Sequence, residues 1–180
     1  MNRSARAASP GMLIALVSLP IFVGALDLTV VSAVLPHVVY DLEIPLQTGL
    51  DEAAWIVSGY LLAYGIAMTF MGRMSDIIGR RQVFLIALVI FGIGSYLVAV
   101  ADTWPARGVL RAAAWLTDGR PDPALVALWT LVGARMVQAF GGGAMVPVGM
   151  TVVGDLYPAG QRAAPLGVIA AVDTAGWVVG

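Results

Sequence analysis

Five long runs of apolar residues constrain this chain more than any other feature of its sequence. A helix needs about 20 mainly apolar residues to cross the hydrocarbon core of a bilayer. Strands of a membrane barrel would alternate polar and apolar residues, which these runs do not, so we expect transmembrane helices. The runs cover residues 11–37, 54–71, 83–101, 124–153 and 165–180. The predicted fold is an all-α integral membrane bundle (residues 11–180) of about five transmembrane helices, the last of them incomplete.

Composition excludes the main soluble alternatives. Apolar residues make up 59% of the 180-residue chain and charged residues 12%, against roughly 45–50% and 25% in soluble domains. The net charge of −1 gives no basic field to attract nucleic acid. The sequence has no cysteine, and it contains no nucleophile paired with a base, no phosphate-binding loop and no metal-ligand cluster. We therefore expect no enzymatic activity, no cofactor, no metal and no nucleic-acid partner.

The distribution of arginine predicts the orientation of the bundle. Residues 1–10 and the loops that start near Gly72 and Gly154 carry six arginines, whereas the opposite loops carry three. Because cytoplasmic loops carry the excess of basic residues, we expect residues 1–10 to be a cytoplasmic tail of a multi-pass protein of the inner (plasma) membrane. On the opposite side, residues 106–116 have the spacing of a short amphipathic surface helix, and the simpler interpretation is a solvated connector.

Three ionisable residues lie inside the predicted spans: Asp27, Arg135 and Asp173. Each costs at least about 2.5–3.5 kcal/mol at a helix centre, so such residues usually face a bundle interior or a watery cavity. Asp27 either titrates or recognises a cation, or it only pairs with an arginine. Gln138 follows Arg135 by one turn on a similar face, and Arg135 either fixes helix register or tunes a carboxylate. Asp173 is either a cavity acid or a packing partner of a neighbour such as Thr174.

The segment of residues 72–81, called here the latch loop, joins the second and third predicted spans. Glycines near both ends would allow a tight reversal at the membrane surface. Asp76 could cap the next helix and pair with the arginines one turn later. The glycines and charged residues of this loop are Gly72, Arg73, Asp76, Gly79, Arg80 and Arg81. In the fifth span, Gly176 and Gly180 have the spacing that lets two membrane helices pack closely.

The latch loop resembles the signature loop of the major facilitator superfamily, G-x-L-a-D-r-x-G-R-[RK]. Residues 26–36 resemble the first-span motif of one branch of that family, the fourteen-span drug:proton antiporters, and Trp55 and Tyr60 also lie as in that branch. The departures in these two motifs are Met74 for Leu, Ile77 for Arg, Ser32 for Asn and Val34 for Ala. Both motifs occur in the expected order along the chain.

Two further segments resemble the same branch. Residues 131–142 are similar to the fourth-span motif l-x-x-x-R-x-x-q-G-x-g, with Arg135 and Gln138 in place and alanine for the first glycine. The pair Gly176 and Gly180 resembles the start of the fifth-span antiporter motif g-x-x-x-G-P. Together the four motifs cover most of the chain.

The resemblance implies two six-helix bundles around a central cavity and transport by alternating access. This chain would supply spans one to five of the N-terminal half-bundle of a proton-coupled exporter of amphiphilic organic compounds or drugs. The resemblance further implies a role for Arg135 in proton coupling, a titrating or substrate-facing role for Asp27, and a conformational latch at Asp76 and Arg80, within reach of Asp155. Expected partners are membrane lipid, protons, a small-molecule substrate, and the C-terminal bundle or a partner membrane subunit.

Two alternatives remain at this point. The chain could be a non-transporting, transporter-derived structural subunit of a larger membrane complex, since it would lack half of the fold. It could also belong to an importer of sugars or ions, although the first-span and fifth-span motifs argue against that function.

Overall fold

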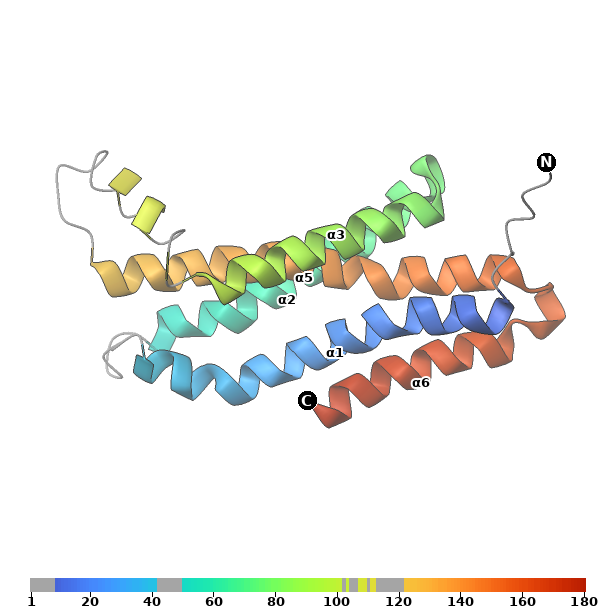
Figure 1. The fold of residues 1–180 in the computed structure, drawn as a ribbon, viewed down its shortest axis with the longest axis horizontal. Coiled ribbons are helices and arrows are strands. Elements are labelled where there is room, and N and C mark those ends of the chain that lie inside the picture. The colour runs from blue at the N-terminus through green and yellow to red at the C-terminus, as the bar shows by residue number, and fades with distance from the viewer. Residues whose placement is uncertain (1–8, 42–49, 102, 104–106, 110, 113–121) are drawn as a thin grey trace, which may run out of the picture.

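The computed structural model of the chain describes residues 9–41, 50–101, 103, 107–109, 111–112 and 122–180. Its main elements are α1 (Pro10–Asp41), α2 (Leu50–Ile78), α3 (Arg80–Ala99), α5 (Pro123–Leu156), the 3-10 turn η1 (Ala159–Gln161) and α6 (Ala163–Val179) (Figure 1). Four helices, α1, α2, α3 and α5, are long and apolar enough to cross a membrane, and α6 is a shorter apolar helix. The all-α membrane fold is therefore confirmed. Most of the predicted surface segment 106–116 lies outside the described residues.

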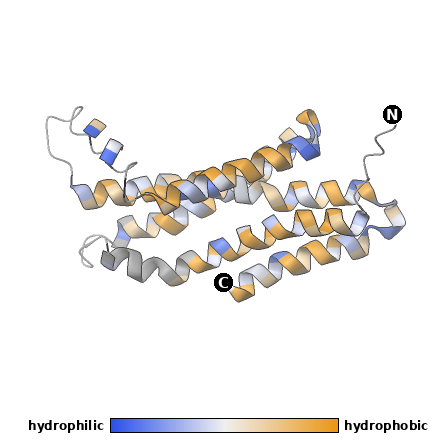
Figure 2. Cartoon of the chain, in the orientation of Figure 1, coloured by the Kyte–Doolittle hydropathy of each residue, from blue (hydrophilic) through white to orange (hydrophobic). Residues whose placement is uncertain are grey.

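Apolar residues surround these helices instead of lining one face. In the view of Figure 2, hydrophobic positions extend along the length of the helices, with hydrophilic positions at many of their ends and a few in between. Large side chains such as Leu19, Leu62 and Val89 are more than half exposed. A helix that is hydrophobic all round is stable only when it is fully buried or surrounded by lipid. The exposed apolar surface of this bundle is therefore the surface that would face lipid.

Helix α5 is the centre of the bundle. It packs along both α2 and α3, while α1 packs mainly on α6 (Figure 1). At 34 residues and a rise of 1.5 Å per residue, α5 is about 51 Å long, well beyond the roughly 30 Å of a bilayer core. It must tilt or protrude, and it contains one internal proline, Pro147.

Glycines allow the helices around α5 to approach backbone to backbone. A Cβ atom at Gly141 would overlap the backbone of α3 at Phe91 and Ala87, and one at Gly143 would overlap the backbone of α2 at Tyr64. Small residues at such contacts are typical of membrane helix packing, where backbones must come close for dispersion forces to act.

The junction between α2 and α3 differs from the predicted latch-loop reversal. Helix α2 continues to Ile78, so Gly72 and Asp76 are helical and the turn is made at Gly79 alone, with φ of 110°. The expectation that Asp76 caps the next helix is therefore wrong: Gly79 is the N-cap of α3 and no side chain caps it. The reason is local, because only the glycine adopts the positive φ that turns the chain within one residue.

Candidate functional site

A buried polar network links α1, α3 and α5 in the middle of the bundle. The guanidinium of Arg135 donates from Nη1 to Oδ2 of Asp27 at 2.8 Å and to Oε1 of Gln138 at 2.6 Å. Nε2 of Gln138 donates in turn to Oδ1 of Asp27 at 3.0 Å and to Oγ of Ser95 at 2.9 Å. The structure thus brings together three of the four in-membrane residues singled out in the sequence: Asp27, Arg135 and Gln138.

Burial makes this pairing necessary. The side chain of Arg135 is 2% exposed and that of Asp27 is 21% exposed. An unpaired charge at such a place would be strongly destabilising, whereas a paired and hydrogen-bonded one is tolerated. The arrangement follows from helix geometry, because residues three apart on α5 share a face and Gln138 can therefore reach both the arginine and its carboxylate.

Sequence reasoning did not assign two members of this site. Ser95 reaches Gln138 because Gly94 lets α3 come so close that a Cβ there would overlap the backbone of Gln138. Tyr60 of α2 is fully buried, and its ring lies below the guanidinium of Arg135, 4.3 Å from its carbon Cζ. The sequence indicated Tyr60 only through its position in the second span, which matches that of the antiporter branch. It contained no indication of a role for Ser95.

Asp173 lies outside the network. Its Oδ1 atom is buried and has no hydrogen-bond partner among the described residues. Tyr64 of α2 and Trp177, one turn later on α6, are its electrostatic neighbours. Thr174, the neighbour suggested as its packing partner, donates instead to the carbonyl of Ala170 on its own helix at 2.9 Å.

A second charged contact joins the latch loop to the end of α5. Arg80 forms an ion pair with Asp155 and donates to the carbonyl of Thr151 at 3.4 Å. Its contact with Asp76 is longer, 3.9 Å, and the Asp76 side chain is 71% exposed. Within the described part of the chain, the remaining latch-loop arginines, at positions 73 and 81, form no ion pair.

The predicted glycine pair of the fifth span lies against α1. A Cβ atom at Gly176 would be 2.7 Å from Cβ of Ala25, and one at Gly180 would overlap Thr29. Both positions therefore need the absence of a side chain for α6 to lie on α1.

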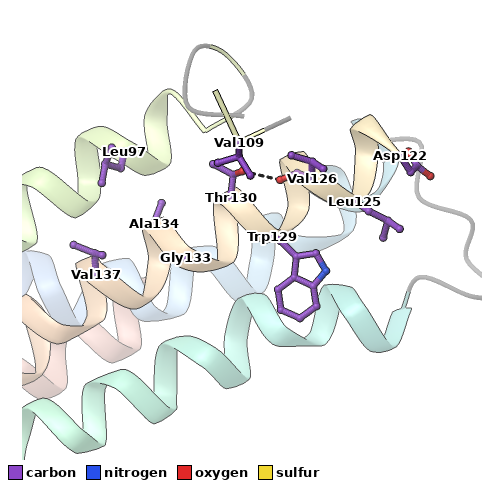
Figure 3. A pocket seen from close by; sticks show the side chains of 10 residues that line it. All are labelled: Leu97, Val109, Asp122, Leu125, Val126, Trp129, Thr130, Gly133, Ala134 and Val137. Atoms are coloured by element: carbon purple, nitrogen blue, oxygen red, sulfur yellow. Dashed lines mark hydrogen bonds between the residues drawn. The ribbon is translucent and has the colours of Figure 1, made fainter. Parts of the chain in front are cut away.

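A separate cavity of about 670 Å³ lies between the ends of α3 and α5 (Figure 3). Its walls are mainly apolar; they include Leu97, Val126, Trp129 and Val137. Asp27, Arg135 and Gln138 do not line it, so this cavity and the polar network are different features. No group of three metal-ligating side chains occurs among the residues that the structure describes.

The chain is similar to transporters of one family. It is 29% identical over 169 residues to multidrug resistance protein 3 of Bacillus subtilis (strain 168), covering 94% of this chain and 27% of that protein. It is 34% identical over 163 residues to a triacylglyceride transporter of Mycobacteroides abscessus, covering 91% of this chain and 27% of that protein. The chain therefore spans about a quarter of the length of these relatives.

The fold has a solved counterpart. The inward-open xylose transporter XylE of E. coli superimposes with a TM-score of 0.70 at 18% identity, over 94% of this chain and 38% of that one. At this identity the likeness concerns the fold alone. The family model described as Major Facilitator Superfamily matches residues 17–180. The chain therefore belongs to the major facilitator superfamily.

Proposed function

We propose that this chain is the N-terminal portion of a proton-coupled secondary transporter that exports amphiphilic organic compounds or drugs by alternating access. The observation that carries the proposal is the buried network of Asp27, Arg135 and Gln138. Ionisable groups are costly inside a membrane bundle, and they mark ion or substrate pathways where they occur. The carboxylate of Asp27 accepts hydrogen bonds from both Arg135 and the amide of Gln138. A movement of the helices can therefore change which of these two donors it binds.

The named functions of the relatives support the substrate class. Multidrug resistance protein 3 favours an exporter of structurally varied organic compounds. The relatives named triacylglyceride transporters add apolar lipids to the candidate substrates. Both classes agree with a bundle whose exposed and cavity-lining residues are mostly apolar.

The remaining parts of the proposal concern orientation and partners. The arginine distribution favours a cytoplasmic N-terminus in an inner (plasma) membrane. The latch loop, through Arg80 and Asp155, would then act as a conformational latch on the cytoplasmic side. Membrane lipid, protons, a small-molecule substrate and a further helical bundle, of the same protein or of a partner subunit, would complete the pathway.

The test uses the full-length protein in proteoliposomes that contain a pH-sensitive dye, with ethidium as the transported probe. Asp27→Asn and Arg135→Ala are each expected to abolish ethidium-driven proton movement. Thr69→Val is the control: Thr69 is exposed on α2, and its hydroxyl donates to the carbonyl of Gly65 on its own helix, at 3.4 Å. The control should transport normally. Unchanged coupling in both test variants would contradict the proposal. Absence of ethidium-driven proton movement in the unsubstituted protein would favour a non-transporting structural subunit.

A further inference from the structure

The two carboxyl groups inside the bundle differ in how their oxygens are satisfied. Both oxygens of Asp27 accept hydrogen bonds, Oδ2 from Arg135 at 2.8 Å and Oδ1 from Gln138 at 3.0 Å. Oδ1 of Asp173 is buried and accepts none from any described residue. Arg135 also neutralises the charge of Asp27, whereas no basic side chain in the described ranges forms an ion pair with Asp173.

The groups that face Asp173 do not replace a cation. Its electrostatic neighbours are Tyr64 of α2 and Trp177 of α6 itself, and neither is a basic residue. On the helices packed against α6, Asp27 of α1 and Arg135 of α5 are bonded to each other. A buried carboxylate oxygen without a donor is costly while it carries charge, and the cost falls when a proton occupies it.

We propose that Asp173 holds the exchangeable proton of this bundle, while Asp27 is bound in the ion pair with Arg135. This inference rests on the proposed function, because it assigns the proton of the same transporter. The step is a reversible proton transfer between water and Oδ1 of Asp173. Uptake forms an O–H bond and removes the negative charge, and release returns the proton to water and restores the carboxylate.

The position of Asp173 also connects its proton to helix movement. Gly176 follows it by three residues and so lies on the same side of α6. That side contacts α1, because a Cβ at Gly176 would be 2.7 Å from Cβ of Ala25 and 2.8 Å from the carbonyl oxygen of Phe22. A shift of α6 along or away from α1 would therefore change the exposure of Asp173 to water, and with it the balance between the neutral acid and the carboxylate.

Infrared spectroscopy of the purified full-length protein in lipid tests this assignment without any transported substrate. At neutral pH, exposed carboxyl groups are ionised, so the carbonyl stretch of a protonated carboxyl reports a buried acid. We expect the wild-type spectrum to contain this band and the band to shrink as the pH rises. Asp173→Asn should lose the intensity of one carboxyl, Asp173→Glu should retain a band, and Asp27→Asn should keep the wild-type band.

Two results would overturn the inference: identical bands in wild type and Asp173→Asn, or loss of the same band in Asp27→Asn. If Asp173→Asn does not fold, labelling of the wild type with a hydrophobic carbodiimide, which reacts with protonated carboxyl groups, decides the matter. Modification of the α6 peptide at Asp173 supports the inference, and modification of α1 at Asp27 contradicts it. If the protein moved no protons in response to ethidium, the proposed function would be contradicted. The infrared band would still show whether Asp173 is protonated.

Discussion

The guanidinium of Arg135 lies over the ring of Tyr60, 4.3 Å from the ring centroid, although the two residues come from α5 and α2. The hydroxyl of the same Tyr60 is buried and has no hydrogen-bond partner among the described residues. The ring therefore stabilises the fold through its contact with the cation, whereas the hydroxyl destabilises it through the loss of its hydration.

Tyr60→Phe should leave transport unchanged and keep stability within about 1 kcal/mol, since the ring remains and only an unpartnered hydroxyl is removed. Tyr60→Leu should weaken the placement of Arg135, because a cation–π contact is worth about 0.5–2 kcal/mol when desolvated. The comparison is measured as thermal unfolding of the purified protein and as ethidium-driven proton movement. Equal behaviour of the two variants would show that the ring has no positioning role.

Arg135→Lys tests the geometry of the guanidinium separately from its charge. A lysine keeps the positive charge but loses the planar guanidinium, which lies over the Tyr60 ring and places Nη1 against both Asp27 and Gln138. Loss of one charge-assisted hydrogen bond, about 1.5–3 kcal/mol, should lower the coupled transport rate roughly 10- to 100-fold. The rate is measured in proteoliposomes at equal protein content. Wild-type rates would mean that charge alone suffices at this position.

Gly141→Ala should disrupt the contact between α5 and α3, since its Cβ would overlap backbone atoms of Phe91 and Ala87 that cannot rotate away. Overpacking of this kind costs about 1–3 kcal/mol. Gly133→Ala is the matched control on the same helix, because nothing lies within 4 Å of its Cβ position. The melting temperature, followed by tryptophan fluorescence, should fall for the first variant and not for the second. A similar melting temperature in both would contradict the backbone contact.

Gly79→Ala should strain the α2–α3 junction. At φ of 110° and ψ of 134°, an alanine would occupy a region that costs about 1–3 kcal/mol. Gly72→Ala, about two turns earlier within α2, has open space around its Cβ and should have little effect. Chemical unfolding of both variants measures the difference. A neutral Gly79→Ala variant would mean that another residue makes the turn.

Asp155→Asn should weaken the bundle more than Asp76→Asn, although by no more than about 1 kcal/mol, since both carboxylates are exposed. The ion pair between Asp155 and Arg80 links α5 to α3. Asp76 lies only four residues before Arg80 in the chain, and its Oδ1 is 3.9 Å from Nη2 of Arg80. Because the effect is electrostatic, it should shrink in high salt. Thermal unfolding at low and high salt checks the order, and a larger loss in the Asp76 variant would reverse the assignment.

The sequence predicted the helical membrane fold because hydropathy is a local property that needs no knowledge of neighbours. The pairing of Arg135 with Gln138 was also accessible, since residues three apart share a helix face. The contact of Ser95 with Gln138 could not be predicted, because a serine inside an apolar run does not indicate which helix it faces. The α2–α3 turn was placed too early for a related reason: Gly72 and Gly79 look alike in sequence, and only the backbone shows which one leaves the helix.

Pro147 divides the central helix between its two sets of polar contacts. Arg135 and Gln138 precede it, and Asp155 follows it. Because proline has no N–H, the carbonyl four residues earlier, that of Gly143, loses its helical partner. The two segments of α5 are thus joined by one bond fewer than a continuous rod would have. The segment that carries Asp155 is therefore less firmly coupled to the segment that carries Arg135 than it would be in a helix without an internal proline.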